Sequence, residues 1–94
     1  MIIVSGKIIV DSQDRASYLE GCREVIELAR NSPGCLDFHL SADPIENGRI
    51  NVYEQWETVE DVEAFRGSGP SAEQSAEIRA AQMFQHEVAS SQQL

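Results

Sequence analysis

Two stretches of alternating apolar and polar residues, 35–43 and 49–57, flank the turn-forming sequence Pro-Ile-Glu-Asn-Gly at 44–48. A period of two is typical of a β-strand with one buried face, because successive side chains point to opposite sides. Two such stretches joined by a short turn predict an antiparallel hairpin. One of its faces is expected to carry Leu36, Phe38, Leu40, Ile50, Val52, Glu54 and Trp56.

The residues before and after this hairpin predict further elements. Residues 2–10 alternate like a strand, and residues 11–34 change to a helical spacing that ends at a Ser-Pro-Gly stop. The apolar stripe of this helix consists of Leu19, Cys22, Ile26 and Ala29. Thr58 and Asp61 resemble a capping box with the shorter acid, which predicts a second helix that ends at Gly67.

The end of the chain has two interpretations. A short helix is expected roughly over 71–80, followed by a strand in which Phe84, His86 and Val88 alternate with Met83, Gln85 and Glu87. The sequence before Phe84 could instead extend the helix. Residues from about 90 onward are expected to form a flexible tail.

The order strand, helix, strand, strand, helix, strand predicts an α+β protein with the split β-α-β arrangement of ferredoxin-like folds. In that fold, helices cover one face of a four-stranded antiparallel sheet. The 94 residues contain no repeat or linker and are expected to form a single domain, 1–94. The uncovered face is mixed in polarity, so we expect a homodimer whose sheets pack through His39, Asn51 and Tyr53.

Charge and composition limit the partners. Sixteen acidic residues against seven basic ones give a formal charge of −9, which disfavours binding to nucleic acid and to anionic membranes. A neutral or weakly acidic small molecule suits this charge better. The sequence has no apolar segment of membrane-spanning length and no signal peptide pattern, so a cytoplasmic location is expected. Two cysteines without a CxxC motif and two histidines without matching carboxylates predict no metal site.

Three residues are candidates for chemistry. Trp56 can wall a binding pocket for a planar ligand or fill a small core. Glu54 shares its face, where a carboxylate is costly unless it is paired or has a raised pKa; it can be a general base or a structural partner of an amide or arginine. His86 can exchange a proton near neutral pH, or it can be a hydrogen-bonded histidine of the core or rim.

The chain resembles the antibiotic biosynthesis monooxygenase family. The resemblance rests on three stretches: Ser-Pro-Gly-Cys-Leu-Asp-Phe-His-Leu-Ser-Ala-Asp-Pro from Ser32, Glu-Asn-Gly-Arg from Glu46, and the segment from Val52 to Pro70 with its Glu-x-Trp-Glu strand end. It covers most of the chain up to about Ala72. It implies a dimeric α+β barrel with one pocket per subunit, between the sheet and its helices.

The resemblance also implies a chemistry. Oxygenase members use no metal, flavin or other cofactor: a phenol or quinol is held as its anion, gives an electron to dioxygen, and the radical pair recombines. Trp56 would be the aromatic wall, and His86 or Glu54 would accept the proton. The implied pocket residues are Gly6, Phe38, Val52, Phe65 and Phe84.

Two hypotheses follow. The leading one is a cofactor-independent monooxygenase acting on a small aromatic molecule, a quinol or polycyclic phenol. The alternative is a non-catalytic small-molecule-binding or stress-response dimer, which is favoured by Val52 at a position where oxygenase members often carry asparagine. Haem breakdown is not expected, because Arg66 and Gly6 stand nearest to the positions of the histidine and asparagine of haem-degrading relatives.

Overall fold

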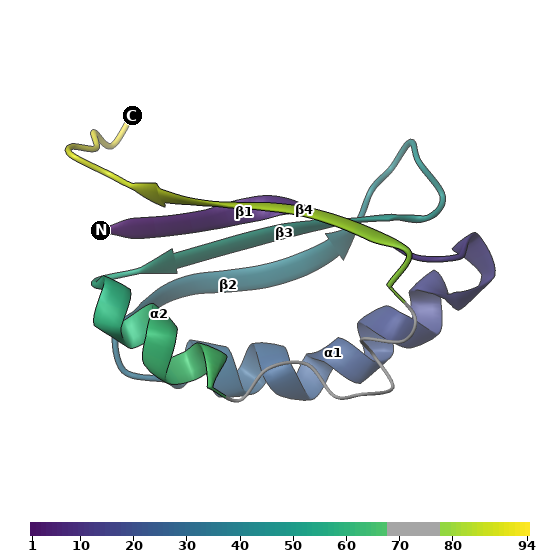
Figure 1. Ribbon diagram of the computed structural model, residues 1–94, viewed down its shortest axis with the longest axis horizontal. Helices are drawn as coiled ribbons and strands as arrows, with labels where there is room; N and C mark the ends of the chain where they lie inside the picture. Colours follow the sequence, from purple (N-terminus) through teal and green to yellow (C-terminus); the bar gives the residue numbers. More distant parts are fainter. Residues whose placement is uncertain (68–77) are drawn as a thin grey trace.

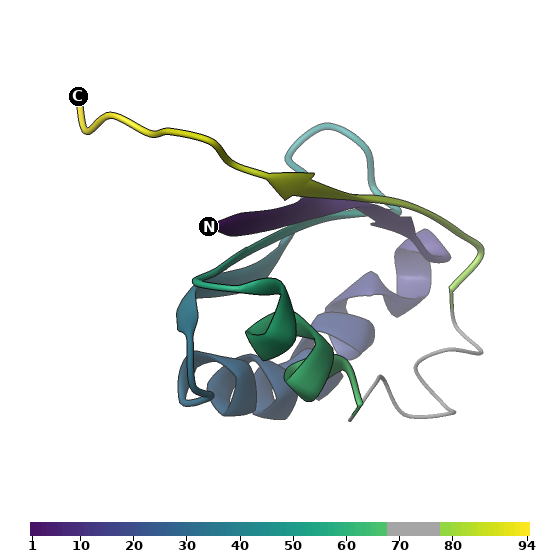
Figure 2. The ribbon, with the colours of Figure 1, turned by 60° about the vertical axis from the view of Figure 1, so that its left-hand side comes forward.

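The computed structural model describes residues 1–67 and 78–94. Along the chain it contains β1 (Ile2–Ile9), a short 3-10 turn η1 (Ser12–Asp14), α1 (Arg15–Arg30), β2 (Cys35–Ala42), β3 (Arg49–Trp56), α2 (Val59–Arg66) and β4 (Ala80–Glu87). The strands form one antiparallel sheet in the order β2-β3-β1-β4. Both helices lie on the same face of the sheet, and the other face is bare (Figures 1 and 2). The predicted ferredoxin-like α+β fold is confirmed.

The last segment is a strand, as the alternation predicted, and it does not extend a helix. The backbone N–H of Arg79 donates to the carbonyl of Ile9 at 2.8 Å, and β4 starts at the next residue. The helix expected over 71–80 falls mainly on residues 68–77, which lie outside the described residues.

The pairing of β1 with both neighbours defines rows of side chains across the helix-covered face. Val4 lies between Glu54 of β3 and Gln85 of β4, and Gly6 lies between Val52 and Met83. Because neighbouring strands place paired residues on the same face, these rows form the floor beneath the helices. β1 therefore brings Glu54 and Met83, which are far apart in sequence, above the same part of the sheet.

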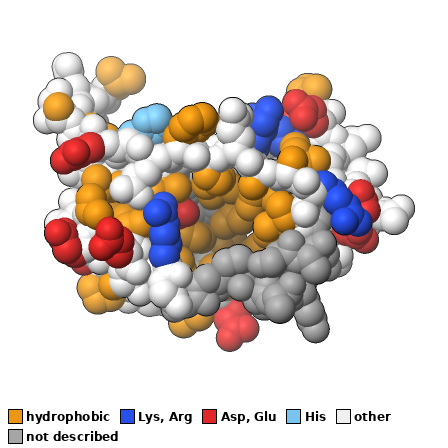
Figure 3. Space-filling model, viewed as in Figure 1, with side chains coloured by type: hydrophobic (Ala, Val, Ile, Leu, Met, Phe, Trp, Pro, Cys, Tyr) orange, Lys and Arg blue, Asp and Glu red, His pale blue; other side chains and the backbone are white. Residues whose placement is uncertain are grey.

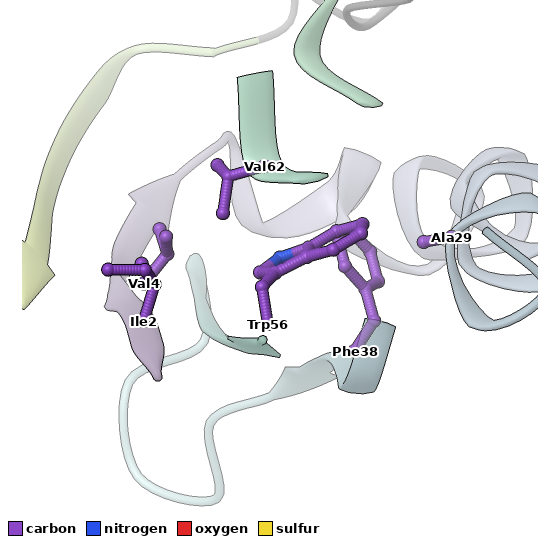
Figure 4. Close-up of a cluster of buried hydrophobic side chains, with 6 residues drawn as sticks. All are labelled: Ile2, Val4, Ala29, Phe38, Trp56 and Val62. Atoms are coloured by element: carbon purple, nitrogen blue, oxygen red, sulfur yellow. The ribbon is translucent and has the colours of Figure 1, made fainter. Parts of the chain in front are cut away.

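The core under α2 is built around Trp56, which has no exposed surface. Figure 4 shows its indole lying between Val62 of α2 and the sheet, beside Phe38, with Ile2 and Val4 on the neighbouring strand. A second cluster under α1 contains Val10, Tyr18, Cys22 and Ile50. Cys22 is buried there, in agreement with its place on the predicted apolar stripe.

The start of α2 is fixed by the predicted cap. The hydroxyl of Thr58 accepts a hydrogen bond from the backbone N–H of Asp61 at 3.2 Å and donates to the Asp61 carboxylate at 2.8 Å. The helix therefore begins directly after β3 and folds back over Trp56. Gly34, at a positive φ of 80°, lies against Asp61, where a side chain would collide with that carboxylate.

The expected placement of Leu36 beside Phe38 is wrong. β2 has a register irregularity between Cys35 and Asp37, so Leu36 has no place in the regular alternation and 50% of its surface is exposed. A β-bulge adds one residue to a strand and reverses the alternation across it. Phe38 and Leu40, beyond the bulge, pair with Glu54 and Val52 on the helix-covered face as expected.

The bare face of the sheet carries the residues expected to meet a second copy. His39 and Tyr53 stack there with ring centroids 5.2 Å apart, and the Tyr53 hydroxyl donates to Gln55 at 3.1 Å. Asn51 also belongs to this face by its pairing with Lys7, and its amide donates to Asp43 at 2.9 Å. The homodimer itself stays a prediction.

Candidate functional site

A cavity of about 600 Å³ lies between the helices and the sheet. Figure 3 shows this face of the molecule hollowed, with hydrophobic side chains around the hollow. Two of the lining residues are charged, Glu54 and Arg66. The remaining lining residues are Ile8, Tyr18, Cys22, Val25, Leu28, Phe38, Leu40, Val52, Phe65, Ile78, Ala81 and Met83. This size and this mostly apolar lining are typical of small-molecule sites.

A second cavity of about 310 Å³ adjoins the first. It shares Glu54, Arg66 and Met83 with the larger cavity and is otherwise lined by Val4, Phe84 and Gln85. The two charged residues therefore border both spaces.

Glu54 is held in place by its neighbour on the same strand face. The indole N–H of Trp56 donates to Oε1 of Glu54 at 2.9 Å, and no described residue hydrogen-bonds to the other carboxylate oxygen. Burial raises the pKa of Glu54, while the Trp56 hydrogen bond and the charge of Arg66 act in the opposite direction. Glu54 is thus an oriented carboxylate at an apolar cavity, with a proton affinity above that of an ordinary glutamate.

Trp56 itself does not line either cavity formed by the described residues, so its expected role as the pocket wall is wrong. Phe65 of α2 lies between the indole and the large cavity, with its ring 5.3 Å from that of Trp56 and 5.5 Å from that of Phe38. The aromatic residues that line the large cavity are therefore Phe38, Phe65 and Tyr18. Trp56 reaches the cavity only through its hydrogen bond to Glu54.

Of the predicted pocket residues, Phe38, Val52 and Phe65 line the large cavity. Gly6 does not, because the Met83 side chain lies over it: a Cβ at Gly6 would be 2.9 Å from the Met83 sulfur and would collide with the Gln82 carbonyl. Met83 thus fills the space that the missing Gly6 side chain leaves.

His86 and Phe84 share a face, as predicted, but it is the bare face of the sheet. His86 pairs with Ile3 and Phe84 pairs with Ser5, while the neighbouring residues Val4 and Gly6 point toward the helices. The expected placement of His86 in the pocket is therefore wrong. Phe84 lies on the same face of β4 but is among the residues that line the small cavity. The rings of the two residues are 6.3 Å apart.

The sequence prediction did not name most of the lining residues, and two of those missed bear on the chemistry of the site, Arg66 and Met83. Arg66 follows Val62 by four residues, so a helical spacing places it on the covered side of α2, and this signal was available. Met83 belongs to the alternation opposite to Phe84 and His86, which was assigned to the other face.

Among residues 1–67 and 78–94, no three His, Cys, Asp or Glu side chains lie close enough together to hold a metal ion. No helix in the same part of the chain is long and apolar enough to cross a membrane.

The family model for antibiotic biosynthesis monooxygenase matches residues 1–85. The comparison with curated proteins gives no significant match.

Several solved structures share this fold. A candidate antibiotic biosynthesis monooxygenase from Deinococcus radiodurans superposes with a TM-score of 0.86 at 14% identity, covering 100% of this chain and 98% of that one. A similar candidate from Nitrosomonas europaea has a TM-score of 0.80 at 15% identity, covering 96% and 100%. One from Chloroflexus aurantiacus has a TM-score of 0.76 at 21% identity, covering 98% and 96%. At these identities the likeness shows the fold alone.

Proposed function

Because the chain belongs to the antibiotic biosynthesis monooxygenase family, we propose that it oxidises a quinol or polycyclic phenol with dioxygen, without a cofactor. The observation that carries this proposal is the carboxylate of Glu54. It is oriented by Trp56, partly buried, and borders an apolar cavity of about 600 Å³. Such a group can take the proton of a phenol whose ring lies between Phe38 and the helices.

The first step is proton transfer. The oxygen of Glu54 that Trp56 does not engage accepts the phenolic proton, and the phenolate forms in an apolar space near the positive charge of Arg66. The raised pKa of Glu54 narrows the gap between its proton affinity and that of a phenol, which favours the transfer. Trp56 acts as a positioning residue in this step.

The second step is electron transfer and bond formation. The phenolate gives one electron to dioxygen, and the aryloxyl radical and superoxide combine at the carbon para to the oxygen. The proton on Glu54 completes the hydroperoxide, whose O–O bond breaks with loss of water to leave a second carbonyl. For 1-naphthol the balance is one phenol and one dioxygen giving one 1,4-naphthoquinone and one water.

The test is oxygen consumption with 1-naphthol and the three-ring analogue 9-anthrol, with quinone formation followed by absorbance. Glu54→Gln keeps an acceptor for the Trp56 indole but removes the base, so turnover should fall by roughly 10²-fold or more. Glu57→Gln, at an exposed carboxylate three residues away, is the matched control and should keep the wild-type rate. Equal rates in wild type and Glu54→Gln would contradict the assignment of the base.

The second candidate function is binding without turnover. Val52 is buried and places an aliphatic side chain on the cavity wall, so the site has no amide there to contact a substrate. In this case 1-naphthol binds in calorimetry but no oxygen is consumed above the protein-free rate. That result would replace the monooxygenase proposal by a small-molecule-binding protein.

We also propose that the working unit is a homodimer formed through the bare face. All residues of β4 are exposed, and 55% of the Phe84 surface is open to solvent. A matching face of a second copy would cover the Phe84, His39 and Tyr53 rings. Sedimentation of the wild type and of His39→Glu tests this: the wild type should be a dimer at micromolar concentration and the variant should dissociate more readily, whereas a monomeric wild type would refute it.

A further inference from the structure

The position of Arg66 carries an inference about the substrate class. The other five arginines of the chain are engaged: Arg15 and Arg30 donate to backbone carbonyls, and Arg23, Arg49 and Arg79 pair with carboxylates. Within the described part of the chain, Arg66 has neither an ion pair nor a hydrogen bond to another residue. It is the one arginine there that is left to bind something else.

Arg66 lines both cavities, next to Glu54 and Met83. Its guanidinium acts on the Glu54 carboxylate electrostatically, but the two residues do not form an ion pair. The small cavity also presents Gln85, whose amide makes no hydrogen bond to a described residue. Arg66 and Gln85, two side chains that can donate hydrogen bonds, therefore both line the small cavity.

We propose that the substrate is a hydroxylated aromatic carboxylic acid whose carboxylate is bound by Arg66, with Gln85 as a second donor, while its hydroxyl meets Glu54. This inference rests on the proposed function and names the substrate class for the same cavity. A planar carboxylate matches the fork of a guanidinium, and the pair gains from charge-assisted hydrogen bonds. The apolar body of the ligand stays in the large cavity against Phe38 and Phe65.

Charge supports a single carboxylate. The protein has a formal charge of −9, which repels anions at long range. Such repulsion is screened beyond about 8–10 Å at ordinary ionic strength. The direct attraction between Arg66 and a bound carboxylate therefore outweighs the repulsion by distant charges. A ligand with several negative charges would be repelled by the Glu54 carboxylate as well as by the net negative charge of the protein. A monoanion with a neutral hydroxyl satisfies both groups.

Three probes of the same ring system separate the contributions: 1-naphthol, 4-hydroxy-2-naphthamide and 4-hydroxy-2-naphthoate. Their hydroxyl and free para carbon are the same, and the last two differ in the charge of one substituent. By calorimetry at low salt, the carboxylate should bind about tenfold or more tightly than the amide, as expected for a charge-assisted contact with partial solvent exposure. Added sodium chloride should weaken the binding of the carboxylate probe and leave the binding of the two neutral probes unchanged.

Arg66→Gln should reduce the affinity of the carboxylate to that of the amide and leave the two neutral probes unchanged. Arg66→Lys should keep part of the preference, and Arg23→Gln, at an exposed arginine of α1, should keep all of it. The inference is overturned if wild type binds carboxylate and amide equally, or if Arg66→Gln weakens all three probes alike. The wild-type comparison needs no variant to fold.

Binding and turnover distinguish the two proposals. Tight carboxylate binding without oxygen consumption supports the contact of Arg66 with an aromatic carboxylate and refutes the monooxygenase. Oxygen consumption with 1-naphthol but no preference for the carboxylate supports the monooxygenase and refutes the role of Arg66.

Discussion

Replacing Trp56 by phenylalanine should destabilise the protein more at neutral pH than at acidic pH. The change keeps an aromatic ring in the core but removes the indole N–H that donates to Glu54 at 2.9 Å. A hydrogen bond to a charged group contributes about 1.5–3 kcal/mol, and the lower end applies here because Glu54 is partly exposed. The smaller ring adds about 1–2 kcal/mol of lost burial in a site with no exposed surface.

The pH dependence follows from the pKa of Glu54, which is raised by burial. Above its folded pKa, the buried charge costs stability, and the Trp56 hydrogen bond offsets part of that cost. Below its unfolded pKa, Glu54 is protonated in both states, so the loss of the charge-assisted bond no longer matters. The pKa of Glu54 should rise further in the variant. As pH increases from the unfolded pKa of Glu54 through its folded pKa, the stability of the variant should fall more steeply than that of the wild type.

The assay is urea denaturation followed by far-UV circular dichroism, because the variant has no tryptophan to report fluorescence. At pH 7.5 we expect a loss of about 2.5–3.5 kcal/mol, and at pH 4 a loss close to the packing contribution of about 1–2 kcal/mol. In a Glu54→Gln background the difference between the two pH values should vanish. An equal loss at both pH values in the wild-type background would refute the stabilisation of the carboxylate by the indole.

Three further predictions concern the supports of the site. Gly6→Ala should cost about 1–3 kcal/mol in urea denaturation, because the new Cβ collides with the Gln82 carbonyl of β4; a neutral result would mean that β4 packs less closely on β1. Thr58→Ala should cost about 1 kcal/mol through loss of the cap on α2, and Thr58→Ser should restore most of it. His86→Gln should leave oxygen consumption with 1-naphthol unchanged, because β4 directs His86 to the bare face; a large loss of rate would contradict that register.

The alternation of apolar residues predicted the sheet and most of its inner face. Ile50, Val52, Glu54 and Trp56 share the helix-covered face as expected, because β3 is central and its alternation is unbroken. Leu36 could not be placed, since the register change between Cys35 and Asp37 depends on pairing with β3 and has no local signal. The side-chain pattern alone also could not show how deeply Trp56 is covered, which depends on the position of α2.

β4 shows a different limit of the sequence. Its alternation predicts which residues share a face, and Phe84 and His86 do, but both sets of its side chains are of similar polarity, so the pattern does not fix which set points inward. The backbone contacts with β1 fix the register, and they include hydrogen bonds at the two ends of β4, from Arg79 to Ile9 and from Val88 to Met1. They place Met83, rather than the aromatic Phe84, over Gly6.

The carboxylate at position 54 is not required by the fold. The indole N–H of Trp56 needs one acceptor, and the amide oxygen of a glutamine would supply it at the same place. A neutral amide would also avoid the desolvation that raises the pKa of Glu54 beside an apolar cavity. The charged group is therefore the less stable choice for packing, which is consistent with the proton transfer to Glu54 that we propose.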